Sequence, residues 1–74
     1  MTLYQFIGLD TNQQAEYVWQ GKFLDTRSEG DYRILLYNLG DFYAEVFYNV
    51  PDNTIAHIKG FKAISHLAPY INLR

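Results

Sequence analysis

Four side chains that could bind an anion or transfer a proton are spaced so that a four-stranded antiparallel sheet would bring them into one row. They are Thr26, Arg33, Tyr48 and His57. A histidine with a tyrosine and an arginine beside it suits anion binding or general acid–base chemistry. Because the row depends on three predicted turns and contains no nucleophile, we favour a structural interpretation. In that interpretation the Tyr48 hydroxyl bonds His57 at the rim of the core.

Residues that would hold a metal or form a covalent intermediate are scarce. His57 and His66 are the two histidines, nine residues apart, and no carboxylate stands at metal-ligand spacing from either. The chain has no cysteine, and a zinc site normally needs three or four ligands. Ser28 and Ser65 lie outside any nucleophile-elbow motif, and there is no glycine-rich phosphate-binding loop. The sequence therefore predicts no metal, no cofactor and no enzymatic activity.

Length and composition favour one small domain over residues 1–74, since domains run from about 50 to 250 residues. A chain this short buries too little surface for a thick core. Aromatic residues make up 18% of the chain, and each large ring can bury roughly 150–250 Å². The first residues show neither a basic start nor a long apolar run, so we expect no signal peptide, no membrane span and a cytoplasmic location.

The charge of the chain argues against a surface devoted to nucleic-acid backbones, because the net charge is −2. Its distribution is uneven. Residues 1–52 contain eight acidic and three basic residues, whereas residues 53–74 contain Lys59, Lys62 and Arg74 and no acid. A short chain can show this by chance; the alternative is head-to-tail electrostatic complementarity between subunits.

The elements that would position these side chains begin with a helix over residues 11–20. Asp10 and Gln13 have the spacing of a capping box, and Gly21 is expected to end the helix in a left-handed conformation. One helix face is apolar, so we expect it to dock on the rest of the chain. This inward stripe comprises Ala15, Val18 and Trp19.

From Lys22 onward the apolar period changes to two, which is typical of strands. Short turn-rich segments separate the runs, and short connections favour antiparallel neighbours. Residues 62–74 could close the chain as a short helix, which Pro69 would end or kink. The predicted fold is therefore a two-layer α+β domain: an N-terminal helix, a four-stranded antiparallel meander and a short C-terminal helix. The predicted strands cover residues 22–27, 32–39, 42–50 and 54–61.

The turns also predict which residues share a face of the sheet. The predicted cross-strand pairs are Leu35 with Val46, Arg33 with Tyr48, Tyr48 with His57, and Thr26 with Arg33. One face then carries Leu24, Leu35, Tyr37, Leu39, Phe42, Ala44, Val46, Tyr48, Val50, Ile55 and Phe61. The opposite face carries Phe23, Asp25, Tyr32, Ile34, Leu36, Tyr43, Glu45, Phe47, Asn49, Ala56 and Ile58. The first face is richer in aliphatic residues, and we assign it to the helices.

The second face would then be an exposed apolar patch, although an antiparallel sheet usually leaves one face polar. Such patches usually mark contacts with other molecules. The expected interface residues are Tyr32, Ile34, Leu36, Tyr43, Glu45 and Phe47. Two alternatives stay open: helices flank both faces, or residues 3–7 fold across the second face.

The leading functional hypothesis is a non-enzymatic protein-interaction module of the inhibitor, immunity or regulatory type. It would form a homodimer or bind a protein partner through the aromatic face. The second hypothesis is a domain that binds a small anionic ligand around Arg33, Tyr48 and His57. A third, an aromatic platform for single-stranded nucleic acid, is opposed by the acidic charge and by Glu45 in its middle. We therefore expect no nucleic acid and no membrane among the partners.

Overall fold

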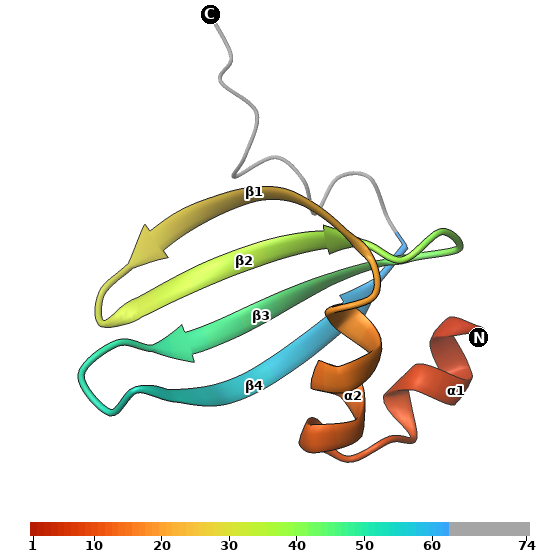
Figure 1. The fold of residues 1–74 in the computed structure, drawn as a ribbon, viewed down its shortest axis with the longest axis horizontal. Helices are drawn as coiled ribbons and strands as arrows, with labels where there is room; N and C mark the ends of the chain where they lie inside the picture. The colour runs from red at the N-terminus through yellow and green to blue at the C-terminus, as the bar shows by residue number, and fades with distance from the viewer. Residues whose placement is uncertain (63–74) are drawn as a thin grey trace, which may run out of the picture.

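The computed structural model describes residues 1–62, in which two helices precede four strands (Figure 1). The sheet order is β1-β2-β3-β4, and neighbouring strands are antiparallel. This confirms the predicted four-stranded meander and gives an α+β arrangement. The predicted C-terminal helix falls on residues 62–74, of which 63–74 lie outside the described residues. The elements are α1 (Leu3–Ile7), α2 (Thr11–Val18), β1 (Lys22–Glu29), β2 (Tyr32–Asn38), β3 (Tyr43–Asn49) and β4 (Thr54–Phe61).

Both helices begin with a capping box, in which two residues three apart satisfy each other's backbone N–H groups. At α2, Asp10 Oδ1 accepts a hydrogen bond from the Gln13 N–H at 2.8 Å, and Gln13 Oε1 accepts one from the Asp10 N–H at 3.1 Å. The predicted cap is confirmed. Thr2 and Gln5 make the same arrangement at α1, with distances of 3.2 and 2.8 Å. The sequence analysis missed α1, although the Thr-x-x-Gln spacing is the signal for it.

Gly21 follows α2, but its role differs from the predicted one. The helix ends at Val18, two residues earlier than expected, and among the described residues the positive φ angles lie elsewhere. The left-handed stop at Gly21 is therefore wrong. A Cβ at this position would collide with the Leu39 side chain and lie 2.8 Å from the Asn38 carbonyl oxygen. Glycine is required here because the chain passes directly against the end of β2.

The β2–β3 hairpin has the predicted register, because its two-residue turn leaves little freedom. Leu35 pairs with Val46 and Arg33 pairs with Tyr48. Gly40 in the turn has a φ of +96°, a conformation that glycine adopts without steric cost. The register of the two central strands is thus a local property of the sequence.

The β3–β4 register departs from the prediction at a bulge in β4. Phe47 pairs with His57 and Tyr48 pairs with Ile55, so Ala56 is an extra residue on β4. The predicted pairing of Tyr48 with His57 is therefore wrong. Because side chains alternate between faces, one inserted residue moves the rest of the strand to the opposite face. The residues that change face are His57, Ile58 and Phe61.

The β1–β2 register also differs, because the turn contains two residues rather than four. Gly30, with a φ of +59°, and Asp31 connect the strands. Thr26 consequently pairs with Leu35 and not with Arg33. This shorter turn moves the side chains of β1 by two positions along β2.

The core lies between the two helices and one face of the sheet, which we call the inner face. Phe6 of α1 and Val18 of α2 pack with Phe42, Ala44 and Val46, all of them buried. The ring centroids of Phe6 and Phe42 are 5.1 Å apart. Both helices contact β4 and lie beside it in Figure 1. The alternative in which the segment that forms α1 crosses the second face is therefore wrong.

The capping box of α2 predicts a measurable stability loss. We expect Asp10→Ala to lower the free energy of unfolding by about 0.5–2 kcal/mol, since it leaves the Gln13 N–H without its acceptor. Urea denaturation measures this change. The control is Asp41→Ala in an exposed hairpin turn, since no described residue hydrogen-bonds the Asp41 side chain. Equal midpoints for the wild type and Asp10→Ala would contradict the cap.

Gly21 and Gly8 form a matched pair of sites for testing whether the chain at Gly21 lies directly against the end of β2. We expect Gly21→Ala to destabilise the fold by about 1–3 kcal/mol, because the new methyl group meets a backbone oxygen that cannot move freely. Gly8→Ala should be neutral or slightly stabilising, since Gly8 has a right-handed φ of −77° and its Cβ would make ordinary contacts. Thermal melts of both variants test this. Tolerance of Gly21→Ala would contradict the contact with β2.

Candidate functional site

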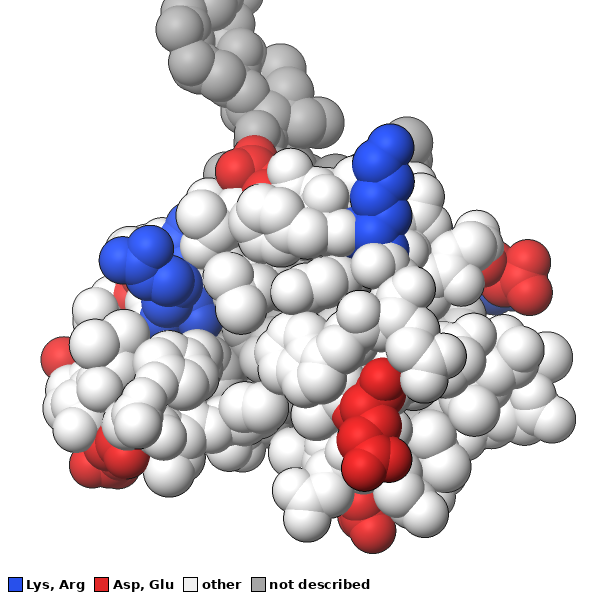
Figure 2. Space-filling view, in the orientation of Figure 1, with Lys and Arg blue, Asp and Glu red and all other residues white. Residues whose placement is uncertain are grey.

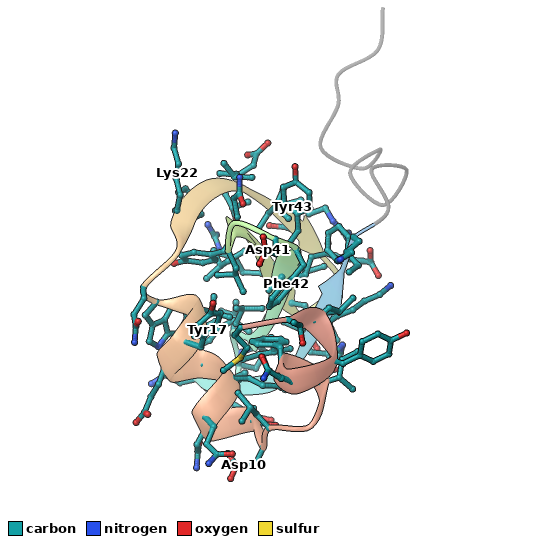
Figure 3. The ribbon with its side chains drawn as sticks, turned by 90° about the vertical axis from the view of Figure 1, so that its right-hand side faces the viewer. Asp10, Tyr17, Lys22, Asp41, Phe42 and Tyr43 are labelled. Carbon is teal, nitrogen blue, oxygen red and sulfur yellow. The ribbon has the colours of Figure 1, made fainter. Side chains whose placement is uncertain are left out.

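The sheet face opposite the helices, which we call the outer face, carries the residues predicted to form an interface. Strand alternation places its side chains between those of the core. In Figure 3 the adjacent Phe42 and Tyr43 point to opposite sides of the sheet. Neither described helix lies on the outer face. Its central cross-strand rows are Asp25–Leu36–Glu45–Lys59 and Arg27–Ile34–Phe47–His57.

The six predicted interface residues all lie on the outer face but differ in exposure. Ile34 is 0% exposed, Leu36 3% and Glu45 4%, so these three are buried. Tyr32, Tyr43 and Phe47 are half-buried. The solvent-accessible part of the predicted interface is therefore aromatic, whereas its central residues are buried.

A buried carboxylate lies at the centre of the outer face and is paired with an arginine from the edge strand. Arg27 Nη2 is 3.3 Å from Glu45 Oε2, and Arg27 Nη1 is 2.6 Å from Glu29 Oε2. The Arg27 side chain therefore reaches across β2 to Glu45 on β3. The Arg27 side chain is 22% exposed. The sequence analysis missed this pair, because it depends on the two-residue turn between β1 and β2.

Two groups of stacked rings flank this ion pair along the strands. At one end, the rings of Phe47 and His57 are stacked with centroids 4.1 Å apart, and Tyr32 meets Phe47 edge-on at 6.2 Å. At the other end, Tyr43 and Phe61 are stacked at 5.8 Å. Aromatic pairs of this kind add about 0.5–1.5 kcal/mol beyond the area that they bury. The outer face therefore presents aromatic groups on both sides of a buried charged centre.

The row proposed for an anionic ligand is not assembled. Arg33 and Tyr48 are neighbours on the inner face, as predicted, but His57 lies on the outer face. The Thr26 hydroxyl donates to the Ile34 carbonyl oxygen at 3.2 Å. The four side chains do not converge, so they do not form the expected anion pocket.

A second exposed apolar surface lies where α2 meets β1. Trp19 is 49% exposed, so its predicted inward position is wrong, and its ring meets Tyr37 edge-on at 5.5 Å. A bulge at Leu24 places Phe23 opposite Tyr37, with ring centroids 5.6 Å apart. The helical spacing of Trp19 did not reveal this, because α2 ends one residue earlier. A hollow of about 150 Å³ here is lined by Tyr17, Gln20, Gly21 and Leu39.

Residues 1–62 contain no cluster of three or more histidine, cysteine, aspartate or glutamate side chains that could hold a metal ion. Over the same residues, neither helix has the length and apolar character needed to cross a membrane. Figure 2 views the side that carries the helices and shows no large surface patch of a single charge. No protein-family model, curated protein or solved structure matches the chain.

The Arg27–Glu45 pair predicts a distinctive mutational pattern. Arg27→Met should destabilise the fold by about 2–3 kcal/mol, below the roughly 3–5 kcal/mol typical of fully buried pairs because Arg27 is partly exposed. Arg27→Met with Glu45→Leu should recover most of this loss, since the buried carboxylate is removed together with its arginine. The control, Glu29→Gln, should cost less than about 1 kcal/mol because that partner is exposed. Urea denaturation of all four proteins tests the pattern; a double variant as unstable as Arg27→Met contradicts it.

Proposed function

We propose that this protein is a non-enzymatic interaction module whose outer face binds a segment of a protein partner. The observation that supports this most directly is the pair of aromatic groups on a sheet face that neither described helix covers. Tyrosine and tryptophan are enriched among the residues that dominate binding energy, because they bury a large area at low entropic cost. Tyr32, Tyr43 and Phe47 would provide these contacts.

The charges of the outer face favour a protein partner over a nucleic acid. Asp25, Glu29 and Glu45 lie on this face, opposed by Arg27 and Lys59. Phosphate groups would meet these acids, and neutralising phosphates requires an excess of lysine and arginine. A polypeptide with both apolar and charged side chains suits the face better.

Both edge strands have features that protect them from pairing with another strand. β1 contains a bulge at Leu24 and β4 a bulge at Ala56. Bulges and charged side chains, such as Arg27 and Lys59, are common devices against edge-to-edge association. This favours contact through the outer face over extension of the sheet.

The test uses the full chain with Tyr32→Ala and Phe47→Ala, and with Trp19→Ala as the control on the second apolar surface. Each folded variant is used to capture partners, and the affinity of a captured partner is then measured with purified protein. Sedimentation at several concentrations detects self-association. We expect each outer-face substitution to weaken binding at least about thirtyfold, as for residues worth 2 kcal/mol or more.

Two results would contradict the proposal. Binding that depends on Trp19 and not on Phe47 would place the interface at the α2–β1 junction. A protein that stays monomeric and captures no Phe47-dependent partner would show that the outer face does not bind other chains. Concentration-dependent association that Phe47→Ala abolishes would identify a second copy as the partner.

A further inference from the structure

The middle of the outer face is buried as deeply as the core, although neither described helix lies over it. The buried residues there are Ile34, Leu36 and Glu45. Their cross-strand neighbours, such as Arg27 and Phe47, screen them from the side, because side chains stand roughly perpendicular to a sheet. The uncovered face of an antiparallel sheet is normally wet. Deep burial at this position calls for a cover above the sheet.

We propose that residues 63–74 of the same chain cover the outer face. β4 ends at Phe61, so the chain leaves the sheet next to the surface that needs a cover. The Phe61 ring is on the outer face, buried and stacked on Tyr43. Residues 63–74 therefore start at the border of the surface that needs a cover.

The segment is long enough to cross the sheet. Strands lie about 4.8 Å apart, so the distance from β4 to β1 is roughly 14 Å. Twelve residues span roughly 18 Å as a helix and up to about 40 Å when extended. Either conformation reaches the far edge at β1, so the inference does not depend on which one is formed.

The composition of the segment matches the surface. It contains no acidic side chain and includes Arg74, whereas Asp25 and Glu29 lie on β1 at the far edge. The Arg74 side chain would therefore be attracted toward the acidic edge of the sheet. Its large apolar and aromatic residues, which could cover the middle, are Ile64, Leu67, Tyr70, Ile71 and Leu73.

This inference deepens the proposed function and rests on it in one respect: a partner that binds the outer face must displace residues 63–74. The C-terminal segment would then act as a built-in competitor. The apparent affinity for the partner is the intrinsic affinity multiplied by the fraction of molecules in which the face is open. Changes that weaken the intramolecular contact should consequently strengthen partner binding.

The primary test is methyl NMR on the full chain, which requires no partner. We expect nuclear Overhauser effects between the methyl groups of Ile34 and Leu36 and those of residues 63–74. A sample that mixes labelled and unlabelled chains shows whether they arise within one molecule. Effects only between molecules would identify a second copy as the cover, and none to residues 63–74 would remove the segment as the cover. Either result overturns the proposal.

A second measurement uses the variant Leu67→Asp with Ile71→Asp, and Ile7→Asp as a matched control on an exposed site of α1. The double variant should shift the Ile34 and Leu36 methyl signals and raise partner affinity by about tenfold or more, whereas the control should do neither. Unchanged methyl signals in the double variant would contradict the cover. The two proposals fail separately: the methyl contacts test the cover alone, and Phe47-dependent binding tests the interaction alone.

Discussion

Strand β3 is buried on both sides, and the rest of the structure is arranged around this constraint. Ala44, Glu45 and Val46 follow one another and are all buried, although neighbouring side chains point to opposite faces. On the inner side, the helices supply Phe6 and Val18 to cover Ala44 and Val46. On the outer side, the buried residue is a carboxylate, so apolar cover is insufficient. A buried charge needs a partner of opposite charge.

The edge strand β1 supplies that partner, Arg27, and the length of the β1–β2 turn determines whether the Arg27 side chain can reach Glu45. With Gly30 and Asp31 as a two-residue turn, Arg27 lies opposite Ile34 and its guanidinium reaches Glu45 across β2. A longer turn would have moved Arg27 along the strand and away from Glu45. A local conformational choice at a glycine thus controls a contact between residues 18 positions apart.

We therefore propose different functions for the two faces of the sheet. The inner face completes a small core, while the outer face combines a closed charged centre with aromatic ends. Bulges protect both edge strands, which leaves a face as the surface for association. An intramolecular cover and a partner would compete for the same aromatic groups, and such competition provides a simple means of regulation. The exposed rings of Trp19 and Phe23 form a separate apolar surface where α2 meets β1.

The sequence alone determined the features that depend on neighbouring residues: the Asp10–Gln13 capping box, the meander and the β2–β3 register. Each follows from side-chain spacing or from a tight turn. Tertiary structure decided the exposure of Trp19, the steric role of Gly21, the bulges at Leu24 and Ala56, and the contact between Arg27 and Glu45. A bulge costs little local free energy, but it moves the side chains beyond it to the opposite face of the sheet. The packing of those side chains therefore decides whether a bulge forms, and the local sequence pattern does not reveal it. The six interface residues were assigned to the correct face because β2 and β3 are joined by a tight turn. The Thr26–Arg33–Tyr48–His57 row instead required the length of the β1–β2 turn and the bulge in β4, and residue spacing predicted neither.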